Sequence, residues 1–492
     1  MRHSKRVVTS FFRWLPLTLI VLGGLWLRTH DLARRPMHAD EANQAVKLGE
    51  LLEAGRYAFD PRDHHGPTLY FAALPIAWVR SERSISLLSE TTVRLVPAIF
   101  GTLAVILLAA LAAPLGRWPA LAAAALLAVS PPAVYYSRDF IQETLLATFT
   151  LAALLAARTW WRSGLTRWAL AAGAVIGLMQ ATKASAPLFL ATAALALALT
   201  RNGERPASRR IRRDAMAAVA SALLAAALLY SSFGTHLGGI RAALETYSHA
   251  LTRFGADAAP TGHEKPWWYY LTLFGWFRAG GLVWHQIVFT ALAVAGLIIA
   301  SVCRDGFLRG VAIYTLVIVI AFSSFAYKTP WHAIHFIPGL ALLAAASLAA
   351  IARLRTGRLG AVAFALIALA TQFQQTWRTS FLRPAEQRNP YAYVHSSPDV
   401  LKYRPLAEAA RIHALDQPIR VISEEYWPLP WYLRGIPHVG YWSAPPDDCD
   451  GVLVIASSTQ AEAVRAKLHG AYRESFLGLR PGFICVLFTR EP

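Results

Sequence analysis

Long apolar runs separated by short polar breaks make up most of the chain as far as Ser380. A helix needs about 20 apolar residues to cross the hydrocarbon core of a membrane, and about eleven segments approach that length. They are approximately Trp14–Arg28, Leu95–Leu115, Trp118–Val134, Ile141–Ala157, Trp168–Ala181, Ala186–Thr200, Ala215–Phe233, Leu282–Val302, Leu308–Phe325, Ala333–Ala352 and Leu359–Phe373. The pattern predicts a mainly α-helical bundle that spans a membrane many times.

The break at residues 29–93 is too long to be a turn. Within it, Asp40–Ala54 and Thr68–Val79 alternate apolar and polar residues at helical spacing, so we expect two helices that lie at the membrane surface.

After Phe381 the hydropathy pattern changes to short alternating segments. The expected helices are Val400–Leu415 and Gln460–Leu468, and the expected strands are Ile419–Ser423, Val452–Ala456 and Phe483–Thr489. We therefore divide the chain into a transmembrane domain, residues 1–380, and a small α/β domain, residues 381–492.

Composition agrees with a membrane protein, because 55% of the 492 residues are hydrophobic and only 16% are charged. The net charge of +19 does not indicate a nucleic-acid-binding protein. Arginines gather in short breaks such as Arg201–Arg213, which is typical of cytoplasmic loops. We expect an inner-membrane protein with a cytoplasmic N-terminus, a retained signal anchor and, after an odd number of spans, an extracytoplasmic C-terminal domain.

Three cysteines are too few for a disulfide scaffold, and their spacing is not that of a metal site. Cys449 and Cys485 either pair outside the cytoplasm or remain unpaired, and the sequence leaves both open.

The richest cluster of ionisable residues is His38-Ala39-Asp40-Glu41-Ala42, just after the first predicted span. Adjacent carboxylates can have their pKa values pushed apart, so that one acts as a general base while the other holds a cation or the geometry. Alternatively, Asp40 is the N-cap of a helix and Glu41 favours the positive end of its dipole. The histidines at 38, 64 and 65 lack the spacing of a helical metal site.

A second cluster contains Arg138, Asp139 and Glu143. The carboxylates are four residues apart, so on one helix they would share a face. In one reading, one of these carboxylates forms an ion pair with Arg138. In the other, both carboxylates line a sugar site while Arg138 binds phosphate. Lys183 and Lys328 fall in breaks on the same predicted side, where they either bind a departing phosphate or, for Lys183, extend to the interface.

Taken in order, several motifs resemble the GT-C superfamily of membrane glycosyltransferases, in the branch of protein O-mannosyltransferases and the bacterial aminoarabinose transferase. They are most similar to the family of flippase-associated proteins of archaeal glycosylation and its bacterial members. The motifs are His38–Ala42, Asp63–Tyr70, Tyr136–Arg138, Thr182-Lys183, Thr329–Trp331 and Trp427–Arg434.

The resemblance implies inverting transfer of a hexose or pentose from a polyprenyl-phosphate donor to an extracytoplasmic lipid, glycan or protein. It places the base at Asp40, with Glu41 as its partner. The expected substrate-binding residues are His65, Arg138, Asp139, Glu143, Lys183 and Lys328. A Mg or Mn ion on Asp40, Glu41 or Asp139 is compatible with oxygen ligands, although no spacing requires one and no metal site is predicted.

Two other functions fit the same sequence. A flippase for lipid-linked sugars, or a factor associated with one, would use the same cations without breaking a bond. A structural assembly protein would instead present residues 382–492 and would not need Asp40.

Overall fold

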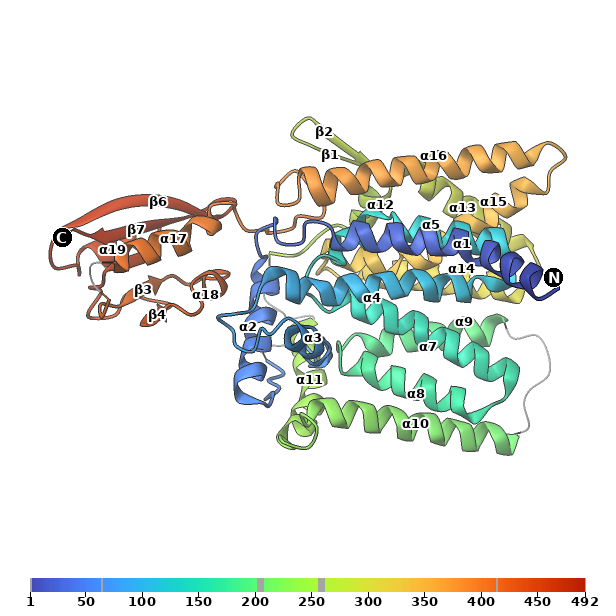
Figure 1. The fold of residues 1–492 in the computed structure, drawn as a ribbon, viewed down its shortest axis with the longest axis horizontal. Helices are drawn as coiled ribbons and strands as arrows, with labels where there is room; N and C mark the ends of the chain where they lie inside the picture. The colour runs from blue at the N-terminus through green and yellow to red at the C-terminus, as the bar shows by residue number, and fades with distance from the viewer. Residues whose placement is uncertain (1, 63–64, 201–207, 255–261, 413–414, 492) are drawn as a thin grey trace. The chain divides into compact units, whose positions relative to one another are not determined.

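The computed structural model in Figure 1 describes residues 2–62, 65–200, 208–254, 262–412 and 415–491. The chain forms two compact units. The helical unit comprises Met1–His30, Arg56–Ala72 and Arg94–Arg383. The sheet unit comprises Asp31–Gly55, Ala73–Val93 and Pro384–Pro492, so two segments of the first long break belong with the C-terminal domain.

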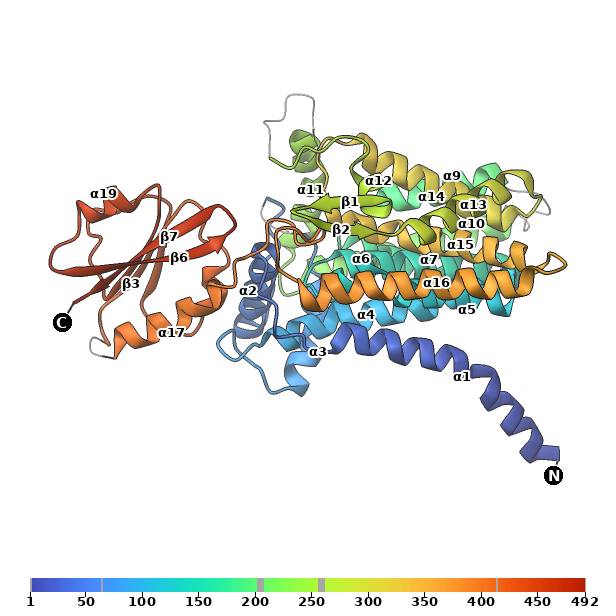
Figure 2. The same ribbon diagram turned by 90° about the horizontal axis from the view of Figure 1, so that it is seen from above.

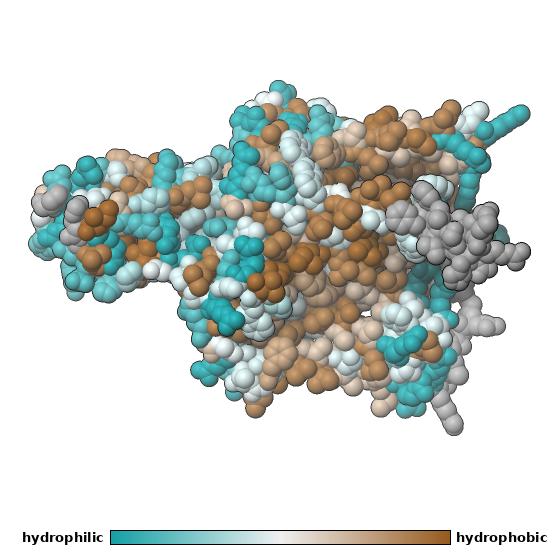
Figure 3. Space-filling model, in the orientation of Figure 1, coloured by the Kyte–Doolittle hydropathy of each residue, from teal (hydrophilic) through white to brown (hydrophobic). Residues whose placement is uncertain are grey.

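Each predicted span overlaps one long helix of the helical unit. These helices are α1 (Arg2–Thr29), α4 (Glu90–Leu111), α5 (Arg117–Ala128), α7 (Glu143–Ser163), α8 (Thr166–Gln180), α9 (Ala186–Thr200), α10 (Ser208–Tyr230), α13 (Ile287–Val302), α14 (Gly306–Ser324), α15 (Ile337–Ala352) and α16 (Gly357–Trp377). Five segments are long and apolar enough to cross a membrane, namely α4, α7, α14, residues Arg210–Tyr230 of α10, and α16 with its extension to Leu382. Apolar side chains cover the middle of the face of this unit seen in Figure 3. The prediction of a mainly helical membrane bundle is therefore confirmed.

Two predicted spans were wrong in detail. The segment Trp118–Val134 breaks after α5, and a separate short helix α6 (Pro131–Tyr136) follows, because Pro131 and Pro132 cannot donate the hydrogen bonds that would continue α5. The first residues of Leu282–Val302 form strand β2 (Leu282–His285), which pairs with β1 (Trp276–Ala279). The two-residue turn between them is Gly280-Gly281, and both glycines have positive φ, which such a hairpin turn requires.

The remaining elements of the first 383 residues are shorter helices. They are α2 (Ala39–Ala54), α3 (Thr68–Val79), α11 (Gly238–Phe254), α12 (Tyr269–Phe274), η1 (Ala113–Leu115), η2 (Pro330–His335) and η3 (Arg378–Leu382). The two helices expected in the first break are present as α2 and α3, and their position at the membrane surface remains a prediction. Part of the arginine cluster Arg201–Arg213, residues 201–207, lies outside the described residues, as do Asp63 and His64.

The sheet unit contains a five-stranded sheet in the order β4-β3-β5-β7-β6. Its strands are β3 (Ile419–Ile422), β4 (Val439–Trp442), β5 (Leu453–Ser457), β6 (Tyr472–Arg480) and β7 (Phe483–Arg490). Strand β3 pairs in parallel with β4 and β5, whereas β7 is antiparallel to β5 and β6. The prediction of a small α/β domain is confirmed, although β4 is short and only half-buried and β6 is mostly exposed, so the sequence pattern did not predict either.

Helices α17 (Val400–Arg411) and α19 (Ala461–Arg465) lie on opposite sides of this sheet (Figure 2). Cys449 packs in the core beneath Val464 of α19. Cys485 instead lies against Tyr403 of α17. Since the two thiols face opposite sides of the sheet, both remain free, as does Cys303.

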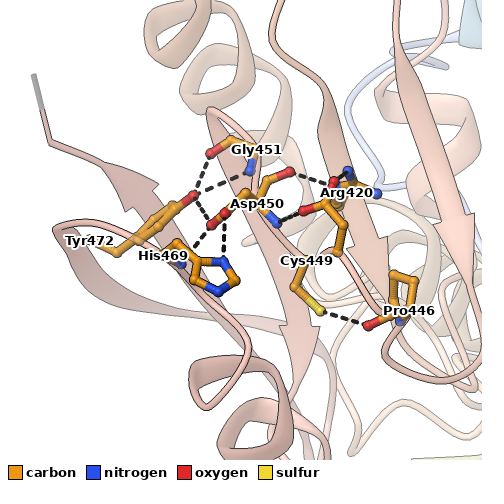
Figure 4. A network of polar contacts seen from close by, with 8 residues as sticks. Arg420, Pro446, Cys449, Asp450, Gly451, His469 and Tyr472 are labelled. Atoms are coloured by element: carbon orange, nitrogen blue, oxygen red, sulfur yellow. Dashed lines mark hydrogen bonds and ion pairs between the residues drawn. The ribbon is translucent and has the colours of Figure 1, made fainter.

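A network of polar contacts fixes the turn that leads into β5 (Figure 4). The carboxylate of Asp450 accepts a hydrogen bond from the backbone N–H of His469 at 2.8 Å, and its other oxygen lies 3.0 Å from the His469 ring. The hydroxyl of Tyr472 lies 3.1 Å from Asp450, and Arg420 donates to the Asp450 carbonyl at 2.5 Å. These contacts hold the start of β5 against β3 and β6.

Helices α8 and α10 pack closely because two glycines of α8 face backbone carbonyls of α10. A Cβ atom on Gly173 would lie 2.0 Å from the carbonyl oxygen of Ala218, and one on Gly177 would lie 2.3 Å from that of Ala222. Small residues at such interfaces let helix backbones approach, and dispersion then stabilises the pair.

We therefore expect Gly173→Val to force α8 and α10 apart and to destabilise the bundle by about 1–3 kcal/mol. Thermal unfolding of the detergent-solubilised protein measures the change. Gly23→Ala in α1 is the matched control, because no atom lies within 4 Å of its added methyl group. Equal melting temperatures for the Gly173→Val variant and the wild type would contradict this packing.

Candidate functional site

The N-terminus of α2 is capped by His38 and not by Asp40. His38 has extended backbone angles, φ −67° and ψ 155°, and its Nδ1 accepts a hydrogen bond from the Asp40 N–H at 3.1 Å. In return, the Glu41 carboxylate accepts a hydrogen bond from the His38 N–H at 3.3 Å. This reciprocal arrangement is a capping box, in which both side chains satisfy backbone donors that the helix itself leaves unpaired. The alternative that Asp40 is the N-cap was therefore wrong.

The two adjacent carboxylates lie in different surroundings. Glu41 is fully buried at 0% exposure, and its carboxylate lies 4.0 Å from the guanidinium of Arg35, which is also buried. Asp40 is exposed. Among the residues that the structure describes, none donates a hydrogen bond or ion pair to the Asp40 side chain. Glu41 thus maintains the local geometry, while the carboxylate of Asp40 is available to an incoming molecule at the positive end of a helix dipole.

The loop before α2 is held by residues from the far end of the chain. The N–H of Met37 donates to the Tyr432 hydroxyl at 2.8 Å, and its carbonyl accepts from the Ser396 hydroxyl at 2.7 Å. The second ring nitrogen of His38, Nε2, lies 3.0 Å from the carbonyl oxygen of Tyr393. With Nε2 bearing its proton toward that carbonyl, Nδ1 is the free acceptor that the cap needs. The sequence did not single out Tyr393 or Ser396, and it gave no sign that Tyr432 of the motif Trp427–Arg434 contacts this loop, because all three lie more than 350 positions away in the chain.

The motif Trp427–Arg434 contains the short helix α18 (Leu429–Tyr432), which packs against α2. The indole of Trp431 is completely buried and donates to Glu90 at 2.7 Å. Arg434 lies over the Trp431 ring at 3.8 Å and donates to the carbonyl of Leu88. This motif therefore connects the segments Asp31–Gly55 and Ala73–Val93 to the C-terminal part of the sheet unit.

In the helical unit, Glu143 and Lys183 form an ion pair. Glu143 is the first residue of α7, and Lys183 lies in the turn between α8 and α9. Their side chains are 3% and 13% exposed. Asp139 is buried in the turn that precedes α7, so it does not share a helix with Glu143, and the expected common face was wrong.

Arg138 is buried, and its Nη1 donates to two carbonyls at the end of α1, those of Leu27 at 3.1 Å and His30 at 2.6 Å. Its guanidinium also lies 4.5 Å from the centre of the Phe381 ring. These contacts connect the end of α1 to η3. Binding of phosphate by Arg138, like sugar contacts by Asp139, remains a prediction.

Two histidines of η2 lie near Lys183, and the sequence did not select them. Burial and the neighbouring charges of Lys183 and His65 lower the pKa of His332, and burial with Lys183 lowers that of His335 to about 3. Both rings are therefore neutral at physiological pH. Nδ1 of His332 lies 3.2 Å from the hydroxyl of Tyr270.

The other two predicted substrate-binding residues differ in exposure. His65 is exposed. The next residue, Gly66, donates its backbone N–H to the carbonyl of Thr182, which precedes Lys183. Lys328 is buried at 2% exposure, and its ammonium donates to the carbonyls of Lys265 and Phe325. Burial lowers the pKa of Lys328.

Within the described ranges, no group of three or more His, Cys, Asp or Glu side chains is arranged to hold a metal ion. Glu41, one of the expected oxygen ligands, is already engaged by Arg35 and by the cap. A Mg or Mn ion remains a prediction.

Residues 83–212 match the family model described as dolichyl-phosphate-mannose-protein mannosyltransferase. No curated protein matches the sequence. Among solved structures, the chain is similar to ArnT from Cupriavidus metallidurans bound to undecaprenyl phosphate, with a TM-score of 0.67, 14% identity and coverage of 96% of this chain and 97% of that one.

The oligosaccharyltransferase of Archaeoglobus fulgidus, tethered with an acceptor peptide, matches with a TM-score of 0.58, 15% identity and coverage of 94% and 73%. The arabinofuranosyltransferase AftD from Mycobacteria matches with a TM-score of 0.53, 13% identity and coverage of 98% and 40%. The chain therefore has the GT-C fold, as the sequence resemblance implied.

We expect Glu143→Gln or Lys183→Met alone to destabilise the protein by about 3–5 kcal/mol, because each leaves one buried charge without its partner. The double variant should be more stable than either single variant, since it leaves no buried charge. Unfolding midpoints in detergent measure this coupling. Additive losses in the double variant would contradict a direct ion pair.

Proposed function

We propose that the chain is a membrane glycosyltransferase that moves a sugar from a polyprenyl-phosphate donor to an acceptor on the extracytoplasmic side. The GT-C fold supports the reaction class, and the match to a mannosyltransferase family model supports a lipid-phosphate donor. The similar ArnT structure was solved with undecaprenyl phosphate bound. The observation that carries the proposal is the exposed, unengaged carboxylate of Asp40 at the N-terminus of α2.

In the proposed reaction, Asp40 accepts the proton of an acceptor hydroxyl as its oxygen attacks the anomeric carbon. The bond from that carbon to the phosphate oxygen breaks through an oxocarbenium-like transition state, and polyprenyl phosphate leaves with the electron pair. Attack from the face opposite the phosphate inverts the anomeric configuration. Glu41 does not take part in the proton transfer, and acts by fixing the start of α2 together with Arg35.

The departing phosphate needs fixed positive charge. We assign this role first to Lys183, because it supplies positive charge beside the neutral rings of His332 and His335. Arg138 and Lys328 are assigned second, because both are buried cations in breaks on the same predicted side as Lys183.

We also propose an inner-membrane location with a cytoplasmic N-terminus. The arginine-rich breaks at Arg117, at Arg158 to Arg167, and at Arg353 to Arg358 alternate with the breaks that hold Arg138, Lys183 and Lys328. An odd number of membrane crossings then places the C-terminal part of the sheet unit, with Asp40, outside the cytoplasm.

Asp40→Asn tests the base. Mass spectrometry of lipid-linked sugars that accumulate in a deletion strain identifies the donor, and transfer from that donor is then measured with purified protein in nanodiscs. Removing a general base should lower the transfer rate by a factor of about 100–10,000, while donor binding should be retained.

Glu50→Gln is the matched control, because Glu50 is an exposed carboxylate on the same helix. It should leave the rate unchanged. An Asp40→Asn variant as fast as the wild type would exclude Asp40 as the base. Translocation of the lipid-linked sugar by a wild-type protein that forms no glycosidic bond would favour the flippase instead.

The topology is tested by alkaline phosphatase fusions, since this enzyme is active only outside the cytoplasm. A fusion after Arg355 should be inactive, and a fusion at the C-terminal end should be active. The reverse pattern would invert the proposed orientation.

A further inference from the structure

The sheet unit has a second group of polar and aromatic side chains that the proposed transfer chemistry does not use. The parallel strands β3, β4 and β5 end side by side, because Ile422 is aligned with both Trp442 and Ala456. The strand that follows β3 in the chain, β4, pairs with one edge of β3, and the next strand, β5, pairs with its other edge. In open α/β sheets, ligands bind beyond the carboxyl ends of the strands at such a switch in strand order.

We define the strand-end site as residues Ser423–Tyr426, Ser443 and Ser457–Gln460. Its central group is the exposed carboxylate of Glu424, which accepts hydrogen bonds from the Ser457 hydroxyl at 3.3 Å and from the Gln460 amide. The bond from Gln460 holds the pKa of Glu424 below its usual range. Glu424 is therefore an ionised acceptor that faces solvent.

Gln460 supplies a polar atom that is not satisfied within the described part of the chain. Its side chain is only 9% exposed, and its nitrogen donates to Glu424 and to the Ser443 carbonyl at 2.7 Å. Its oxygen Oε1 is buried and has no hydrogen-bond partner there. Burying an amide oxygen without a partner costs free energy, so a donor from a bound molecule would relieve it.

Aromatic rings lie at the same end of the sheet. The rings of Tyr426 and Tyr441 are 5.2 Å apart, and that of Trp427 is 6.1 Å from Tyr426. All three side chains are partly exposed. A sugar presents pairs of hydroxyl donors along its edge and C–H groups on its face, and it is bound by a carboxylate and amide beside an aromatic ring.

We propose that the strand-end site binds a saccharide, with neighbouring sugar hydroxyls donating to Glu424 and the ring face against Tyr426. The segment that leaves this site continues directly into α18, which packs against α2, the helix that carries Asp40. The saccharide is therefore assigned as part of the acceptor. That assignment rests on the proposed function, whereas saccharide binding itself does not.

Saturation-transfer NMR on the full chain in nanodiscs tests the proposal. The probes are the methyl glycosides of mannose, glucose, galactose and arabinose, with glucosamine as a cationic comparison. At least one neutral glycoside should receive saturation, and Glu424→Gln and Tyr426→Ala should each weaken its binding by at least about tenfold. Glu474→Gln is the matched control, since Glu474 is an exposed carboxylate on β6 that pairs with Arg465.

The proposal is supported if Glu424→Gln and Tyr426→Ala both lose saturation transfer to the glycoside while Glu474→Gln retains it. Three results would overturn it: no saturation of any neutral glycoside, equal saturation in Glu424→Gln and the wild type, or saturation of glucosamine alone. The Asp40→Asn variant separates this proposal from the proposed function, because it should lose transfer and keep saccharide binding. Binding without any transfer in the wild type would contradict only the proposed function.

Discussion

Charge inside an apolar helical bundle is costly unless it is paired or hydrogen-bonded, and this cost explains the arrangement of cations in the helical unit. Arg28 is completely buried near the end of α1 and donates to the carbonyls of Gly24, Leu127 and Ala128. Arg138 donates to the carbonyls of Leu27 and His30, and Lys328 donates to those of Lys265 and Phe325. Backbone carbonyls therefore accept hydrogen bonds from all three buried cations.

The same principle separates the two carboxylates at the start of α2. Glu41 is buried and is stabilised by Arg35 and by the N–H of His38, so it has no capacity to exchange partners without loss of the cap. Because His38 caps the helix, Asp40 is released from that task. Asp40 then lies exposed to solvent at the positive end of the α2 dipole. The difference between the two residues therefore depends on one histidine.

The sequence predicted the helices well because their signal is local: an apolar run long enough to cross a membrane is recognisable without knowledge of its neighbours. It did not predict that His38 is the cap, since the tautomer of that ring depends on the carbonyl of Tyr393. It selected Lys183 and Glu143 separately, but their pairing joins the start of α7 to the turn after α8, 40 residues further along the chain. His332 and His335 gave no sequence signal, because only tertiary packing places them beside Lys183.

The central claim is that a new glycosidic bond forms by a single displacement with Asp40 as the base. The most direct measurement is the anomeric configuration of that bond, read from the one-bond carbon–hydrogen coupling of the product by NMR. A single displacement predicts the configuration opposite to that of the lipid-phosphate donor. A product with the donor's own configuration, or sugar recovered only on its lipid carrier, would contradict the account.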